Sequence, residues 1–281
     1  MTTMNTPNSA SSSHPLPERM PAIGARGRRP VTDPTSLSDI SLPVPNPVGR
    51  DLLVEVQGVS VNPVDVKVRA GAPTSGAPRI LGYDAAGVVV AVGDEITRFA
   101  VGDRVYYAGQ IDRPGTDARY HLVNENIVGH APHTLSVAET AALPLTVITA
   151  WESLFDRLAL TRESEGVLLV IGAAGGVGSL IIQLAKALTR LEVVAVASRP
   201  ETAEWVRKMG ADHVVGRDFT TEVSALAPTG VDYVFTSFTP GNVRAIADVI
   251  RPRGQVVSID ETGGSIDALK AKSVTWHWEL M

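Results

Sequence analysis

The sequence predicts an α/β protein in which a β-rich domain precedes a doubly wound parallel sheet. Short apolar strands separated by Gly-Asp turns fill the first half of the chain, and helical segments alternate with short apolar runs from about Leu143 onward. The length of 281 residues allows one or two domains. We therefore expect a tail over residues 1–19, a β-rich domain over residues 20–140 and an α/β domain over residues 141–281.

The composition excludes several classes of protein. Hydrophobic residues make up 44% of the chain and charged residues 20%, as in an ordinary globular protein. The net charge of −5 provides no basic field that would hold a nucleic-acid backbone. No apolar run reaches the roughly 18 residues of a membrane span, and no secretory signal is recognisable. We therefore expect a soluble, cytoplasmic protein that binds neither nucleic acid nor a membrane.

The first domain begins after a segment that has little to bury. Residues 1–19 are rich in Ser, Thr, Asn and Pro, which predicts a disordered tail. Beyond it, Leu52, Val54 and Val56 alternate with polar residues, a pattern typical of a strand with one buried face. Further strands are expected at residues 87–92 and 105–107, each next to a Gly-Asp turn. The pattern predicts a small barrel or sandwich.

The second domain shows six apolar runs with helical segments between them. The runs are residues 167–171, 193–197, 213–215, 231–235, 255–259 and 274–280, and the helices are expected at 177–189, 201–209, 221–226 and 242–250. In the first helix, Leu180, Leu184, Ala187 and Leu188 share the face that we expect to be buried. Strands that alternate with helices in this way predict a parallel sheet with crossover helices.

A glycine-rich loop stands between the first of these strands and its helix. Gly175 would let the backbone approach a pyrophosphate, and Gly178 would let the helix pack closely on its strand. The N–H groups and the positive dipole end of the helix would then face the phosphates. Ala173 replaces the first glycine of the dinucleotide-binding pattern, and Gly172 stands one place earlier. The expected phosphate contacts are Ala174, Gly175, Gly176 and Val177; the alternative is a merely structural turn.

Two other nucleotide-binding patterns are excluded. No Lys-Ser or Lys-Thr follows the glycines, so the loop is not a P-loop. None of the five tyrosines is followed four positions later by a lysine, as the short-chain dehydrogenases require.

The end of the second strand predicts which nicotinamide cofactor is bound. A carboxylate at this place would accept hydrogen bonds from the ribose hydroxyls of NAD and would repel a 2′-phosphate. The sequence has Ser198 and Arg199 instead, and a guanidinium suits a phosphate. We therefore expect NADP(H), with Arg217 as a second, weaker contact. The alternative is that Arg199 is a solvated loop residue.

Several further motifs occur in order along the chain: Asn62-Pro63-Val64-Asp65, Leu81-Gly82-Tyr83-Asp84, Gly102-Asp103-Arg104-Val105 and Leu143-Pro144-Leu145-Thr146, followed by the glycine loop. With these motifs and the glycine loop behind a β-rich domain, residues 20–281 resemble the medium-chain dehydrogenase/reductase superfamily, and within it the quinone oxidoreductase branch that often carries the label "zinc-type alcohol dehydrogenase-like". The resemblance implies a GroES-like catalytic domain, a Rossmann domain, and NADPH-dependent reduction of a quinone, enone or related carbonyl.

The same resemblance argues against catalytic zinc. Zinc-using relatives hold the metal with Cys and His at motifs that match Asn62 and Tyr83, and the sequence contains no Cys. His130 and His133, near His121, lack a carboxylate that would complete a ligand set. We therefore expect no bound metal.

Without a metal, hydrogen-bond donors have to stabilise the oxyanion that develops on the substrate. Tyr83 offers a hydroxyl and Asn62 an amide, and we expect both to be catalytic; the alternatives are a packed aromatic side chain and a turn residue. Thr146 matches a family position next to the nicotinamide. Ser237 follows the fourth strand, at the sheet edge where ligands bind, and is expected to contact ribose or nicotinamide.

Two expectations concern the last strand. Family members continue past residues 276–281 and return to the catalytic domain, so the sequence suggests a C-terminal truncation. The resemblance also implies a possible homodimer that pairs the last strands of two copies, which would cover an exposed edge. The alternative to an active reductase is a truncated, catalytically weak NADP(H)-binding protein.

Overall fold

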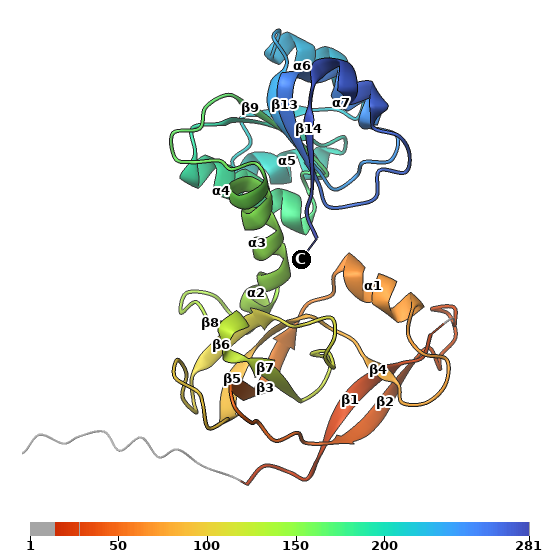
Figure 1. Cartoon of the computed structure of the whole chain (residues 1–281), viewed down its shortest axis with the longest axis vertical. Helices are drawn as coiled ribbons and strands as arrows, with labels where there is room; N and C mark the ends of the chain where they lie inside the picture. Colours follow the sequence, from red (N-terminus) through yellow and green to blue (C-terminus); the bar gives the residue numbers. More distant parts are fainter. Residues whose placement is uncertain (1–14, 28, 281) are drawn as a thin grey trace, which may run out of the picture. The chain divides into compact units, whose positions relative to one another are not determined.

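The computed structural model describes residues 15–27 and 29–280, which form two compact units, Met1–Ala142 and Leu143–Met281 (Figure 1). Most of the expected tail, residues 1–14, lies outside the described residues. Arg19 does not belong to a tail, because it begins strand β1 and pairs with Pro43 of β2.

The first unit contains two antiparallel sheets. One has the strand order β2-β1-β4 and the other β7-β3-β5-β6-β8. The strands are β1 (Arg19–Ala25), β2 (Leu37–Pro43), β3 (Asp51–Val59), β4 (Arg79–Ile80), β5 (Asp84–Val92), β6 (Arg104–Ala108), β7 (Tyr120–Asn124) and β8 (Val128–His130). The helical segments are α1 (Pro63–Ala70), η1 (Glu125–Ile127) and α2 (Val137–Ala141). The sequence predicted β3, β5 and β6 but not helix α1, whose start at Pro63 follows the N-cap residue Asn62.

Strand β3 is buried on both faces, which differs from the prediction of one buried face. Leu52 and Val54 pack into one apolar cluster, whereas Leu53 packs with Met20 and Tyr120 in another. The second cluster exists because β1 and β7 bring apolar side chains to the face that the local alternation assigned to solvent.

The second unit contains one sheet of six parallel strands in the order β11-β10-β9-β12-β13-β14. The strands are β9 (Val167–Ile171), β10 (Glu192–Val196), β11 (His213–Val215), β12 (Val231–Thr236), β13 (Ile250–Ser258) and β14 (Thr275–Trp278). The helical segments are α3 (Pro144–Trp151), η2 (Glu152–Arg157), α4 (Gly176–Leu188), α5 (Pro200–Lys208), α6 (Thr220–Leu226), α7 (Val243–Val249) and η3 (Asp267–Lys272). The predicted doubly wound parallel sheet is confirmed.

Alternate residues of the central strand β9 face two separate apolar clusters. Leu168 and Val170 pack with residues of α4 and α5, whereas Leu169 and Ile171 pack with residues of α6 and α7. The strand is therefore apolar throughout, as expected for a parallel strand that is covered on both faces.

The predicted buried face of α4 is wrong in part. The buried apolar residues of the helix are Ile181, Ile182 and Ala185, whereas Ala187 is exposed. Gly178 lies against the loop that follows β9, on the face of the helix that also buries Ile181, Ile182 and Ala185, which leucine spacing alone did not indicate.

Strand β14, at the dark blue end of the chain, pairs with β13 and lies at the edge of the described sheet (Figure 1). Its Trp278 is 52% exposed. Pairing of this edge with a second copy stays a prediction. No helix among the described residues is long and apolar enough to cross a membrane.

Candidate cofactor and substrate sites

The loop between β9 and α4 has the close packing that its glycines were expected to allow. Gly172 has φ +82°, a region that favours glycine. A Cβ atom at Gly178 would lie 2.4 Å from the carbonyl oxygen of Gly172 and 2.8 Å from Cα of Ala173. Gly175 is the N-cap of α4 and exposed. Any larger residue at Gly178 would push the helix away from the strand.

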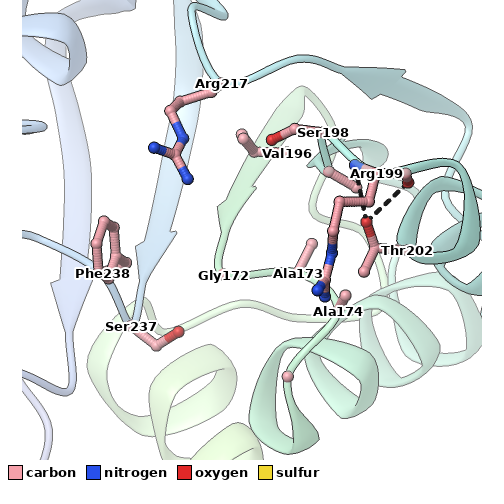
Figure 2. A pocket seen from close by; sticks show the side chains of 12 residues that line it. Gly172, Ala173, Ala174, Val196, Ser198, Arg199, Thr202, Arg217, Ser237 and Phe238 are labelled. Atoms are coloured by element: carbon pink, nitrogen blue, oxygen red, sulfur yellow. Dashed lines mark hydrogen bonds between the residues drawn. The ribbon is translucent and has the colours of Figure 1, made fainter.

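A cavity of about 690 Å³ opens beside this loop, at the carboxyl edge of the parallel sheet (Figure 2). Its walls are Gly172, Ala173, Ala174, Gly175, Val196, Ala197, Ser198, Arg199, Thr202, Arg217, Ser237 and Phe238. A second cavity of about 570 Å³ shares five of these residues and extends along the start of α6 and toward α7. Ligands of open parallel sheets bind at this edge.

The lining brings together six of the nine predicted cofactor-binding residues. These are Ala174, Gly175, Ser198, Arg199, Arg217 and Ser237. Gly176, Val177 and Thr146 are not part of the lining. Thr146 nevertheless lies beside the loop, because a Cβ atom at Gly176 would be 3.2 Å from its methyl carbon. The hydroxyl of Thr146 donates to the carbonyl oxygen of Leu143 at 2.9 Å.

The charge of the cavity is positive. Arg199 and Arg217 extend from the ends of the neighbouring strands β10 and β11, and Arg199 reaches toward the glycine loop (Figure 2). Neither arginine forms an ion pair within the described part of the chain. No Asp or Glu lines the first cavity, and the first turn of α4 carries no acidic residue. An anion bound in this cavity would face two arginines and the positive end of a helix.

The backbone at Arg199 is fixed by a residue that the sequence analysis did not single out. The hydroxyl of Thr202 donates to the carbonyl oxygen of Arg199 at 2.9 Å and accepts from its N–H at 3.2 Å (Figure 2). Thr202 stands three residues after the N-cap Arg199, the spacing of a capping box, which is a signal that sequence analysis could have used.

Phe238 is a second lining residue that the sequence analysis missed. Its side chain is 61% exposed and lines both cavities, next to Ser237. An apolar side chain in such a position offers a surface on which a flat ring can stack. The neighbouring Thr239, by contrast, is buried and hydrogen-bonded to Ser258 and Asp260, which gives it a structural role.

The two predicted catalytic residues lie in the first unit, where Asn62 contacts the buried Asp84 carboxylate and Tyr83 precedes Asp84 in the chain. The Asn62 amide donates to Asp84 Oδ2 at 2.8 Å and to Ser60 Oγ at 3.2 Å. Asn62 is buried, and these contacts fix the orientation of its amide beside Asp84. Direct donation from Asn62 to a substrate stays a prediction.

Tyr83 directly precedes Asp84 and is only 7% exposed. Its hydroxyl forms no hydrogen bond with any described residue. Burial raises the pKa of Tyr83, the Arg79 guanidinium opposes this effect, and the Asp65 carboxylate adds to it. Tyr83 is therefore a protonated donor at neutral pH.

The described histidines form no cluster of metal ligands. His121 is buried, where burial lowers its pKa to about 4, so the ring is neutral. Its Nε2–H donates to the carbonyl oxygen of Pro114, and its Nδ1 accepts from the Tyr107 hydroxyl, each at 3.0 Å. Both ring nitrogens are therefore occupied. The described residues contain no group of three or more His, Cys, Asp or Glu side chains that could hold a metal ion.

Comparison with known proteins identifies both halves of the chain. Residues 49–148 match the sequence family described as the alcohol dehydrogenase GroES-like domain, and residues 176–275 match the zinc-binding dehydrogenase family. The zinc that the second name implies does not fit the side chains described above, and the sequence contains no Cys.

Three similar proteins span most of the chain. A zinc-type alcohol dehydrogenase-like protein from Staphylococcus epidermidis is 38% identical over 93% of this chain and 80% of its own length. The NADPH-dependent alkenal/one oxidoreductase of Arabidopsis thaliana chloroplasts is 37% identical over 77% of this chain and 56% of its own length. A solved structure from Rhizobium etli CFN 42, described as a zinc-dependent alcohol dehydrogenase, has 49% identity and a TM-score of 0.88 over 94% of this chain and 79% of that one.

The antiparallel first unit, the parallel sheet with its glycine loop, and these matches agree with one another. The chain belongs to the medium-chain dehydrogenase/reductase superfamily, as an oxidoreductase in which a GroES-like domain precedes a Rossmann-type domain that binds a nicotinamide cofactor.

Proposed function

We propose that this protein is an NADPH-dependent reductase of enones, quinones or related carbonyl compounds, and that it works without catalytic zinc. The observation that carries the proposal is the pair Ser198 and Arg199 at the end of β10, in a cavity whose lining includes no carboxylate. A carboxylate there would favour NADH, whereas a guanidinium and a hydroxyl favour a 2′-phosphate.

The fit of the cofactor rests on the chain's own residues. Gly172, Gly175 and Gly178 keep side chains away from the start of α4, so that N–H groups of its first turn remain available to a pyrophosphate. Arg199 and Arg217 add positive charge at the ends of β10 and β11. Ser237 and Thr146 lie beside the loop, where we assign them to ribose and nicotinamide contacts.

Bound NADPH supplies a hydride to an electrophilic carbon of the substrate. The protein then has to stabilise the negative charge that develops on the substrate oxygen. The Tyr83 hydroxyl is the donor that we assign to this task, because it is buried, protonated and without a partner among the described residues. Asp84 follows Tyr83 directly in the chain. The Asn62 amide donates to the Asp84 carboxylate and thereby supports the position of Tyr83.

The substrate class follows from this chemistry and from the relatives. The similar proteins include one whose name states NADPH-dependent reduction of alkenals and alkenones. A buried neutral donor suits an oxygen that gains charge during the reaction, as the carbonyl oxygen of an enone or a quinone does. Enones are therefore the first compounds to test.

We expect the purified protein to oxidise NADPH in the presence of an α,β-unsaturated ketone or a quinone, and to use NADH at least about tenfold less efficiently, since losing one charge-assisted contact costs about that factor. Prior treatment with a strong chelator should leave the rate unchanged. Steady-state absorbance assays with each cofactor test both statements. NADPH binding without turnover of either substrate would identify a catalytically weak nucleotide-binding protein, and a chelator-sensitive rate would contradict zinc independence.

A further inference from the structure

The Tyr83 hydroxyl is a buried polar group without an internal partner. The residue is only 7% exposed, and its oxygen forms no hydrogen bond with the described residues. Nearly all buried polar groups in folded proteins are hydrogen-bonded, so an exception calls for an explanation such as a missing ligand.

The main chain around Tyr83 is held firmly. The N–H of Gly82 donates to Asp65 Oδ1 at 3.2 Å, and the carbonyl oxygen of Tyr83 accepts from the N–H of Gly109 at 2.8 Å. Gly82 has φ +91°, and a Cβ atom there would lie 2.4 Å from Thr116 Oγ1. The backbone therefore cannot shift easily to give the hydroxyl a different partner.

A second buried polar atom without a partner belongs to Arg79, four residues before Tyr83 in the chain. This residue begins β4, where it pairs with Ala25 of β1, and its Nη2 donates to the carbonyl oxygen of Ile111. Its Nε is buried and forms no hydrogen bond with the described residues. The Arg79 guanidinium lowers the pKa of the Tyr83 hydroxyl against the larger effect of burial.

Other charged groups near Tyr83 are engaged elsewhere. The Asp65 carboxylate accepts from the N–H groups of Asn62 and Gly82, and burial together with the Asp65 charge raises the pKa of the neighbouring Asp117. Asp65 raises the pKa of Tyr83, so Arg79 is the group that counteracts it.

We propose that Tyr83 and Arg79 form the subsite for the carbonyl oxygen of the substrate, a proposal that rests on the function proposed above. In the substrate complex that we propose, the Tyr83 O–H donates to the substrate oxygen. The Arg79 Nε–H, which has no partner among the described residues without substrate, then donates to the Tyr83 oxygen. Arg79 is a positioning residue, because it acts through Tyr83.

The proton balance of an enone reduction fits this arrangement. After the hydride from NADPH adds to the β-carbon, the O–H bond of Tyr83 breaks and its proton passes to the substrate oxygen, which gives an enol. The enol converts to the saturated ketone. Arg79 stabilises the phenolate left on Tyr83 until water returns a proton to it.

Turnover of an enone tests the two roles separately. Tyr83→Phe removes one oxygen atom and should lower kcat about 100-fold, the effect of losing one oxyanion donor. Arg79→Met should lower kcat about tenfold, and Arg79→Lys, which keeps the charge, should recover part of that loss. NADPH affinity, measured by fluorescence titration, should stay unchanged in all three variants.

Two control variants match these changes. Tyr106→Phe removes the hydroxyl of a half-buried tyrosine in the same unit. Arg26→Met removes an arginine that, like Arg79, donates to a loop carbonyl oxygen, here that of Gly76 at 2.8 Å. Both controls should turn over the enone at the wild-type rate.

A spectroscopic measurement tests the subsite without turnover. In a complex with NADP⁺, the carbonyl carbon of 4-phenylbut-3-en-2-one labelled with ¹³C at that atom should shift downfield on binding to the wild-type protein. The shift should disappear in Tyr83→Phe and shrink in Arg79→Met. An unchanged shift and unchanged kcat in Tyr83→Phe would overturn the subsite while leaving the reductase function intact. A wild-type protein that neither binds nor reduces the enone would overturn both.

Discussion

Replacing Arg199 with Ala should raise the Kd of NADPH about 10- to 100-fold and leave that of NADH nearly unchanged, because the guanidinium contributes a charge-assisted hydrogen bond worth about 1.5–3 kcal/mol. Arg199 lines the cavity at the end of β10 and forms no ion pair within the described residues, so its charge is available to a phosphate. NADH lacks the 2′-phosphate and should not respond to the loss. Calorimetric titration of the variant with each cofactor gives both values.

Arg207→Ala is the matched control for this change. Arg207 lies in the last turn of the same helix, α5, is exposed, and does not line either cavity. Its replacement removes the same charge. Because salt screens an exposed charge, the Kd of NADPH and the Kd of NADH should both stay close to the wild-type values. Equal losses of NADPH affinity in the two variants would show that net charge, not a contact at Arg199, sets the preference.

Replacing Gly178 with Ala should destabilise the second unit by about 1–3 kcal/mol, the usual cost of overpacking a close contact. The added Cβ would lie 2.4 Å from the carbonyl oxygen of Gly172, which is backbone and cannot rotate away. An Ala in a helix is otherwise more favourable than Gly by about 1 kcal/mol, so a loss of stability would be specific to this contact. The displaced loop should also bind NADPH more weakly.

Thermal unfolding with and without NADPH measures both effects. The variant should unfold at a lower temperature, and NADPH should raise its Tm less than that of the wild type, since the stabilisation by a ligand depends on its affinity. Gly264→Ala serves as the control, because a Cβ there meets no heavy atom within 4 Å. A Gly178→Ala variant with wild-type Tm and a wild-type response to NADPH would contradict the close packing of the loop.

The parallel sheet was predictable because its strands are covered on both faces. Strands β9 and β11 have the predicted bounds. Strand β9 is a continuous apolar run between two glycines, and β11 has two valines before Gly216. Strand β13 begins five residues earlier than predicted, at Ile250. The segment before Gln255 contains charged residues, and Arg253 has φ +62°, so no apolar pattern marks it as a strand.

Elements whose burial depends on distant segments were not predictable. Leu53 is buried because it packs with Met20 of β1 and Tyr120 of the neighbouring strand β7. The buried face of α4 includes Gly178, which lies against Gly172, and leucine spacing does not encode this contact. For both β3 and α4, the local spacing of apolar residues predicted the element. Contacts with distant segments decided which side chains are buried.

The cofactor site was more accessible to sequence analysis than the substrate site. Ser198, Arg199, Arg217 and Ser237 follow parallel strands, and parallel strands bring their carboxyl ends to one edge. The hydrogen bond from the Asn62 amide to the Asp84 carboxylate joins residues 22 positions apart, and no local pattern in the sequence predicts it. The sequence likewise does not show that the Arg79 Nε and the Tyr83 hydroxyl are buried without hydrogen-bond partners among the described residues.

Calorimetric titration of the unmodified protein with NADPH and then with NADH tests the central claim most directly. A cavity with two arginines and no carboxylate in its lining predicts saturable binding of both cofactors, with NADPH at least about tenfold tighter. Equal or tighter binding of NADH, or no heat change with either cofactor, would contradict the account.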